Sequence, residues 1–165
     1  MLPDMKLGLD QTTGLKRILK SWKSKDDPGT GNCWYMLNTN VSSPELFLYK
    51  DKGNVKWWRS GHWNGFGWSG VPTLSGPNML FNFSLVNNQT ETTTSWIVLQ
   101  PSLFSRLVVN ESGSIERSIA RETDSQKWLP VGSVPLDQCD NYGKCGAYGK
   151  CVNVNEFECT CLPGF

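Results

Sequence analysis

One stretch of the chain decides the fold: Trp57-Trp58-Arg59-Ser60-Gly61-His62-Trp63-Asn64-Gly65-Phe66-Gly67-Trp68-Ser69-Gly70-Val71-Pro72. Large aromatic residues alternate in it with small, flexible ones. Glycine lets the backbone turn sharply, and tryptophan side chains then fill the space between successive turns. With eight tryptophans and 12% aromatic residues, the chain has ample material for a packed core, so we expect a folded domain.

Short runs of β-branched and aromatic residues lie on both sides of this stretch, and turn signals separate them. In Phe81-Asn82-Phe83-Ser84-Leu85 the apolar side chains share one face of an extended chain, which is typical of a half-buried strand. The sequence therefore predicts an antiparallel all-β fold without strand–helix–strand units. We expect strands at residues 45–49, 55–59, 79–85, 92–99, 104–109 and 114–119.

The segment from Met1 to Gly31 allows two interpretations. Leu15, Ile18, Leu19 and Trp22 recur at helical spacing among lysines and arginines, which is typical of a short basic amphipathic helix that binds a membrane surface or calmodulin. The alternative is a solvated strand or turn whose apolar residues pack on a neighbour. Asp26-Asp27-Pro28-Gly29 then predicts a turn.

Five of the six cysteines lie between Cys139 and Cys161, after a linker that we expect at 129–133. A segment this small builds no core of its own, so the cysteines indicate cross-links formed in an oxidising compartment. A zinc site made of four of these thiolates is the rival interpretation, but no Cys-x2-Cys pair occurs. Calcium is not predicted, because only Asp137 supplies a carboxylate just before Cys139. We expect no metal and no other cofactor.

Four glycosylation sequons, at Asn40, Asn82, Asn88 and Asn110, agree with an exported protein. We therefore expect a secreted chain or one on the extracellular face of the plasma membrane. The start of the sequence lacks the apolar core of a signal peptide, and no apolar run is long enough to span a membrane. These two observations predict a piece of a longer chain, or a gene model that lacks its 5′ end.

Charge and motifs do not point to an enzyme. Sixteen basic and fifteen acidic side chains give a formal net charge of +1, so no general attraction to nucleic acid is expected. His62 is the sole histidine, and between Gly61 and Trp63 we interpret it as a structural turn residue. The sequence contains no G-x-S-x-G elbow, no G-x-x-x-x-G-K-[ST] phosphate-binding loop and no kinase motif. We expect no catalytic residues.

The tryptophan-rich stretch resembles the signature of the S-locus glycoprotein domain, which occurs in plant S-locus glycoproteins and in S-domain (G-type lectin) receptor-like kinases. Upstream, Met5-Lys6-Leu7-Gly8 resembles the end of a bulb-type lectin domain. Downstream, the cysteine spacing resembles an epidermal-growth-factor-like (EGF-like) module that stops before its sixth cysteine. The signature is carried by Trp58-Arg59-Ser60-Gly61, Trp63-Asn64-Gly65 and Ser69-Gly70-Val71-Pro72.

The resemblance implies three parts: the tail of a bulb-type, β-prism lectin domain at 1–31, a β-rich S-locus glycoprotein domain at 32–134, and a truncated EGF-like module at 135–165. It also implies extended chain, not helix, between Leu15 and Trp22. The pairing used by EGF-like modules implies the disulfides Cys139–Cys151 and Cys145–Cys159. Cys161 then loses its partner to the truncation.

The resemblance further implies extracellular recognition, as in self-incompatibility, where pollen is recognised, or in cell-surface signalling. We expect a non-catalytic module whose partner is a protein or peptide ligand, or a second receptor copy. A carbohydrate-binding (lectin) fragment is the alternative. In full-length relatives a membrane helix and a Ser/Thr kinase follow, so membrane contact is expected only through parts of a longer parent.

The candidate binding aromatics are Trp57, Trp63, Phe66 and Trp68. Their alternative role is core packing, because tryptophan is buried on average. Exposure of two or more of them together would favour binding. Cys33 stands where the family has an aromatic residue, and we expect a buried free thiol there. A disulfide from Cys33 to Cys161 or to another chain is the second possibility.

Overall fold

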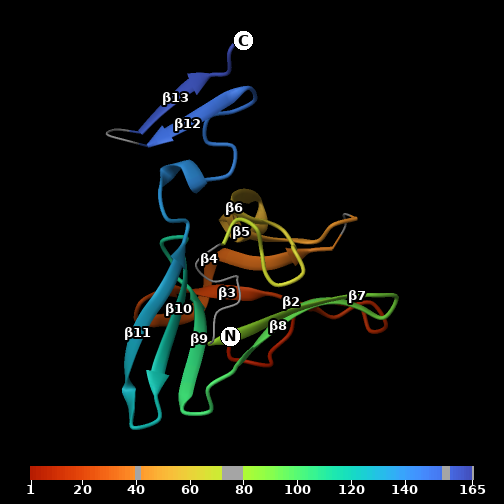
Figure 1. Ribbon diagram of the computed structural model, residues 1–165, viewed down its shortest axis with the longest axis vertical. Coiled ribbons are helices and arrows are strands. Elements are labelled where there is room, and N and C mark those ends of the chain that lie inside the picture. Colours follow the sequence, from red (N-terminus) through yellow and green to blue (C-terminus); the bar gives the residue numbers. More distant parts are fainter. Residues whose placement is uncertain (40–41, 72–79, 154–156, 165) are drawn as a thin grey trace.

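The computed structural model describes residues 1–39, 42–71, 80–153 and 157–164, and this part of the chain is built mainly from antiparallel strands (Figure 1). Two 3-10 turns, η1 (Asp51–Gly53) and η2 (Gln138–Asp140), join them. The all-β prediction is confirmed. The strands are β1 (Leu7–Asp10), β2 (Lys16–Arg17), β3 (Leu19–Ser24), β4 (Asp27–Asn38), β5 (Glu45–Lys50), β6 (Val55–His62), β7 (Phe81–Asn87), β8 (Glu91–Val98), β9 (Leu103–Val109), β10 (Ile115–Arg121), β11 (Asp124–Val134), β12 (Gly149–Asn153) and β13 (Phe157–Cys161).

Within the described residues, these strands form three larger sheets and one hairpin. The first sheet has the order β2-β1-β8-β7, the second β3-β4-β5-β6, and the third β11-β10-β9. The hairpin β12-β13 lies at one end of the molecule, and the turns of the long third sheet reach toward the other end (Figure 1). β1 is inserted between β2 and β8, so the first two strands of the chain share a sheet with β7 and β8, which come much later in the sequence.

All six predicted strands are present, extended or shifted by a few positions. The alternation predicted for β7 is confirmed, since Phe81 is buried and Asn82 is exposed on the opposite face. In β10, Ile115 and Arg117 both point inward, at alternate positions of the strand. Among the predicted strands, β7, β9 and β10 alternate in burial, as in a half-buried sheet, whereas β5 is buried at four consecutive positions.

Of the two interpretations of the segment from Leu15 to Trp22, the helix is wrong and the strand is confirmed. This segment contributes β2 and β3, and β3 pairs with β4 through Leu19↔Tyr35 and Lys20↔Trp34. A helix of this length is marginal in water without tertiary support, whereas β4 supplies the segment with a ladder of backbone partners. The extended chain implied by the family resemblance is the conformation present. The turn predicted at Asp26-Asp27-Pro28-Gly29 lies earlier in the structure: Lys25 and Asp26 form the turn from β3 to β4, and Asp27 to Gly29 already belong to β4.

The segment from Met1 to Gly31 shares sheets and core with the rest of the fold. β4 runs continuously through Gly31 and Asn32, and β1 hydrogen bonds along β8. Leu7 is buried in the same hydrophobic cluster as Trp58 and Trp96. The division of the chain after Gly31 stays a prediction.

The linker predicted at 129–133 is wrong, because these residues form the second half of β11. Pro130 lies opposite Ser118, and Gly132 lies opposite Arg117 in β10. The register shifts between Arg117 and Ser118, as at a β-bulge. β11 is an edge strand, where a proline without an N–H costs no ladder hydrogen bond on its open side. The Pro-Val-Gly composition therefore marks an irregular edge strand.

The hydrophobic core lies between the three larger sheets. Its fully buried members include Leu37 and Leu48 from the second sheet and Ile115 from the third. At roughly 25 cal/mol per Å² of apolar area removed from water, these side chains supply the main stabilising free energy of the fold. The cluster comprises Leu7, Cys33, Tyr35, Leu37, Leu46, Leu48, Trp58, Trp68, Val71, Phe81, Trp96, Leu107, Val109, Ile115 and Val134.

The C-terminal segment after β11 contacts the core region mainly through Tyr142. The backbone N–H of Tyr142 donates to the carbonyl oxygen of Trp57 at 2.7 Å. Its ring meets Phe47 edge-on, with ring centres 5.9 Å apart. Lys56 and Arg59 place their charges over the same tyrosine ring. The contact fixes this segment against the outer face of β5 and β6.

Candidate functional site

Three of the four candidate binding aromatics are held in the interior or against the fold. Trp68 is buried and meets Trp63 edge-to-face, with ring centres 5.3 Å apart. Trp57 is half-buried under the Lys50 ammonium, which lies 3.4 Å from its ring centre, and its indole N–H donates to the carbonyl of Gly113. Only Phe66 is strongly exposed among these four, at 72%. The arrangement favours core packing for this group.

Phe66 lies at the tip of a tight turn that Asn64 stabilises. The Asn64 side-chain oxygen accepts hydrogen bonds from the backbone N–H groups of Phe66 and Gly67. Such an Asx turn holds the loop without help from other elements. Phe66 is thus a single exposed ring, and single exposed apolar residues are common on protein surfaces.

The described sequons differ in their surroundings. Asn82 is exposed on β7, and Asn88 lies in the turn before β8, where its side-chain oxygen accepts hydrogen bonds from Thr90. Asn110 is half-buried, and its amide donates to the Ser114 hydroxyl at 3.1 Å. Asn40 lies outside the described residues. Asn82 and Asn88 therefore offer the more accessible amides for a glycan.

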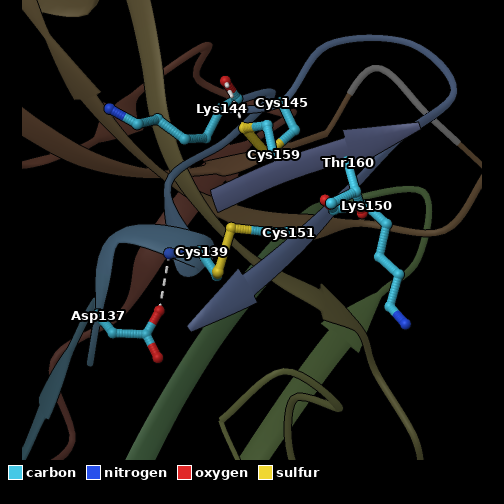
Figure 2. The surroundings of a disulfide bond; sticks show 8 residues. All are labelled: Asp137, Cys139, Lys144, Cys145, Lys150, Cys151, Cys159 and Thr160. Atoms are coloured by element: carbon cyan, nitrogen blue, oxygen red, sulfur yellow. Dashed lines mark hydrogen bonds between the residues drawn. A yellow bond between two sulfur atoms is a disulfide. The ribbon is translucent and has the colours of Figure 1, made fainter. Parts of the chain in front are cut away.

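Two disulfides connect the C-terminal hairpin to the segment that precedes it (Figure 2). Cys139 is joined to Cys151 and Cys145 to Cys159, the same pairs that the EGF-like resemblance implies. The Asp137 carboxylate accepts a hydrogen bond from the backbone N–H of Cys139 at 2.7 Å, at the start of η2. Because four of the five C-terminal thiols are oxidised in this way, too few thiolates remain for the zinc interpretation to hold.

The two remaining cysteines are not joined to each other. Cys33 is buried, and its thiol donates toward the carbonyl of Glu111 at 3.5 Å. Burial raises the pKa of the Cys33 thiol, so the neutral form is favoured. Cys161 is exposed at the end of β13. A pairing between Cys33 and Cys161 is thus absent from the structure.

His62 ends β6, and its exposed ring contacts the buried side chain of Glu45. Its ring nitrogen Nδ1 lies 3.0 Å from the Glu45 carboxylate and 3.1 Å from the Ser43 hydroxyl. Among the described residues, no group of three or more His, Cys, Asp or Glu side chains is arranged to hold a metal ion. The same residues contain no helix long and apolar enough to cross a membrane.

A groove between two sheet edges is a candidate binding site. β3 is the outer strand of the second sheet, β9 is the outer strand of the third, and the two strands contact each other. The groove between them has a volume of about 440 Å³. Trp22 of β3 lines it with 56% of its surface exposed, the most exposed tryptophan among the described residues. Edge strands carry unpaired backbone groups, which are ready partners for another strand.

The outer edge of β9 already forms backbone hydrogen bonds with one residue, Met1. The backbone N–H of Leu107 donates to the carbonyl of Met1 at 2.9 Å, and the Met1 amine donates to the Leu107 carbonyl at 2.8 Å. Backbone groups alternate between the two sides of a strand, so Val109 presents its N–H and C=O to the same edge. This edge is therefore competent for strand addition.

The groove is rich in positive charge. Lys20, Lys25 and Arg106 line it together with one acidic residue, Glu111, which gives a formal charge of 3 − 1 = +2. Lys25 is exposed in the turn between β3 and β4. Lys20 lies over the Trp34 ring at 4.4 Å, and Arg106 over the Trp128 ring at 4.3 Å. The aromatic rings position two of the three cations.

The amino-acid sequence does not predict this groove. Its two walls lie far apart in the chain, and no local motif indicates that β3 and β9 are neighbours. Trp22 is not among the candidate binding aromatics predicted from the sequence. An exposed tryptophan flanked by lysines, in Lys20-Ser21-Trp22-Lys23, is the one local signal available.

The chain matches a known protein family. The model of the S-locus glycoprotein domain matches residues 58–165. The chain belongs to the S-locus glycoprotein domain family. Its match begins at Trp58 of the tryptophan-rich stretch and runs through the stapled hairpin, so the resemblance in the sequence motifs is confirmed.

Plant receptor-like kinases and an S-locus-specific glycoprotein are similar to this chain along its whole length. A G-type lectin S-receptor-like serine/threonine-protein kinase of Arabidopsis thaliana is 41% identical over 100% of this chain and 19% of its own length. A second such kinase of the same plant is 44% identical over 99% of this chain and 19% of its length. An S-locus-specific glycoprotein of Brassica oleracea var. alboglabra is 42% identical over 100% of this chain and 37% of its length. The chain thus spans between a fifth and two fifths of these relatives.

Proposed function

We propose that this chain is a non-catalytic, extracellular recognition module of an S-domain receptor-like kinase or an S-locus glycoprotein. Family membership supports the receptor or glycoprotein context, and the two disulfides support an oxidising compartment. The module would serve pollen recognition or other cell-surface signalling. Kinase activity and membrane anchoring would belong to other parts of a longer parent, as the names of the kinase relatives suggest.

The observation that carries the proposal is the groove between β3 and β9. We propose that an extended peptide of the ligand adds to the outer edge of β9 and covers the exposed face of Trp22. Backbone hydrogen bonds would supply affinity, and side chains on alternate residues of the peptide would supply specificity. Lys25 and Arg106 favour acidic side chains on the peptide.

Selection of random displayed peptides on the secreted, glycosylated chain tests this proposal. We expect enrichment of extended sequences with acidic residues. Trp22→Ala and Lys25→Glu should each weaken the selected peptides at least tenfold, about 1.4 kcal/mol. The matched control is Lys127→Glu, an exposed lysine on β11 outside the groove. If the selected peptides bind both groove variants as tightly as the wild type but bind Phe66→Ala more weakly, the groove is not the binding site. The site then lies at the turn that Asn64 stabilises.

Carbohydrate binding is the second candidate, and one observation favours it. Trp22 shares the groove with Asn110 and Glu111, so an aromatic face lies beside amide and carboxylate groups that can bind sugar hydroxyls. A glycan array with the wild-type chain and Trp22→Ala separates the two candidates. Sugar binding that depends on Trp22, together with failure of the peptide selection, would establish the lectin alternative.

The three-part division of the chain also stays a proposal. Residues 1–31 would be the tail of a bulb-type lectin domain, 32–134 the S-locus glycoprotein domain and 135–165 a truncated EGF-like module. β1 and β3 pair with strands of the middle part. We therefore propose that the first two parts form one cooperative unit, while the stapled module folds separately.

A further inference from the structure

A second groove lies between β8 of the first sheet and β9 of the third, and we call it the Ile97 groove. It has a volume of about 470 Å³, and Leu2, Ile97 and Phe104 are among its lining residues. These three apolar side chains are exposed, Leu2 at 52%, Phe104 at 46% and Ile97 at 39%. Exposed apolar side chains gathered in one place mark a contact surface, unlike a single exposed ring.

Polar groups stand among the apolar ones in the Ile97 groove. Asp4 contributes a carboxylate and Gln100 an amide, and Trp128 adds an aromatic ring beside Phe104. Carboxylate and amide groups bind hydroxyl groups, and aromatic and aliphatic side chains pack on the C–H faces of sugar rings. A carbohydrate therefore matches both kinds of lining residue.

The register of β7 and β8 places a glycosylation sequon next to this groove. Asn82 begins the sequon Asn82-Phe83-Ser84, and its partner in β8 is Ile97. Directly opposed residues of antiparallel strands present their side chains on the same face, with Cβ atoms about 5 Å apart. Asn82 and Ile97 are both exposed, so this is the outer face of the sheet. A sugar on the Asn82 amide starts beside Ile97.

Only one strand separates Asn82 from the far wall of the groove. β7 lies on one side of β8, and the segment from Leu2 to Asp4 lies on the other, where the Asp4 N–H donates to the Trp96 carbonyl at 2.9 Å. Neighbouring strands are about 4.8 Å apart. A short sugar chain that crosses β8 over Ile97 therefore reaches the groove.

We propose that the N-linked glycan of Asn82 folds back over Ile97 and occupies this groove. The innermost N-acetylglucosamine packs on Ile97, and the sugars that follow cover Phe104 and bind Asp4 and Gln100. The volume lies within the range of about 300–1,000 Å³ that is usual for small-molecule sites. The two disulfides agree with passage through the oxidising compartment in which such glycans are attached.

The attachment uses a lipid-diphosphate-linked oligosaccharide as the donor. A bond forms between the Asn82 side-chain nitrogen and the anomeric carbon of the first sugar, while the bond from that carbon to the diphosphate breaks. The nitrogen loses one proton, and the lipid diphosphate leaves. This inference does not rest on peptide binding, because the Ile97 groove and the groove between β3 and β9 share no lining residue.

Nuclear magnetic resonance of the secreted, glycosylated chain tests the proposal directly. We expect through-space proton contacts from the Asn82 sugars to the Ile97 methyl groups and the Phe104 ring. Asn88 is the internal control, because it lies six residues further along the hairpin, about 20 Å from Asn82. Its sugars should contact neither side chain. An unoccupied Asn82, or Asn82 sugars without contacts to Ile97, would overturn the proposal.

Binding of the dye ANS to exposed apolar surface gives an independent measurement. Asn82→Gln removes the glycan at an exposed position and should raise the dye fluorescence at least threefold, and Phe104→Ser in that background should reverse most of the increase. The matched control is Asn88→Asp, which removes a glycan but keeps the oxygen that accepts from Thr90. Equal dye binding by the wild type and Asn82→Gln contradicts the proposal. A dimer of the glycosylated chain that buries Phe104 would instead assign the groove to a second copy.

Discussion

Replacing Gly8 with alanine is expected to detach β1 from β8 and to lower the free energy of unfolding by roughly 3 kcal/mol or more. Gly8 has a φ of +136°, which side-chain-bearing residues rarely adopt. A Cβ there would also run into the carbonyl oxygen of Thr92 and lie 2.9 Å from the Cα of Thr93. Both atoms belong to a paired backbone that cannot withdraw without breaking its ladder.

The matched control for this variant is Gly14→Ala. Gly14 also has a positive φ, of +71°, but a Cβ there would meet no atom within 4 Å. We expect its cost to be about 1 kcal/mol, from the backbone conformation alone. Urea denaturation measures both values, and hydrogen exchange of the β8 amides reports the detachment. Equal losses in the two variants would contradict the role of β1 in the core.

The strands that can be predicted from the sequence are those with a local pattern of apolar, aromatic or β-branched residues. The strands from β5 to β10 carry alternating or β-branched runs, as in Phe81 to Leu85, and the sequence predicts each of them close to its observed bounds. The sequence does not predict β4 and β11, for a physical reason. Pro28 and Gly31 near the start of β4, and Pro130 and Gly132 in β11, lower local strand propensity, and pairing with β3, β5 and β10 overrides it.

The candidate sites depend on contacts between residues that lie far apart in the sequence, so no local sequence pattern predicts them. The spacing of Leu15 to Trp22 fits a helix by coincidence, because the register of β3 shifts between Lys20 and Trp22 and its apolar residues do not share one face: Leu19 packs against the core while Trp22 is exposed. The groove requires β3 to lie beside β9. Arg117 reads as an ordinary polar residue of β10, and only the packing of Trp96 and Phe81 around it reveals a buried charge.

Removing both disulfides is expected to unfold the segment after Pro135 and to leave the β-core intact. The four substitutions are Cys139→Ser, Cys145→Ser, Cys151→Ser and Cys159→Ser. The bridged cysteines are 12 and 14 residues apart, so each bridge restricts the unfolded chain by roughly 3 kcal/mol. No described side chain from Leu136 onward is fully buried, so packing cannot replace the lost bridges.

The tryptophans make this outcome measurable, because all eight lie at or before Trp128. Their fluorescence reports the β-core alone and should keep its unfolding midpoint, whereas the amides of β12 and β13 should lose protection from hydrogen exchange. The control is Cys161→Ser, which removes an exposed free thiol and should change neither signal. If the amides stay protected without disulfides, the Tyr142 contact with Phe47 holds the hairpin, and Tyr142→Ala in that background should then release it.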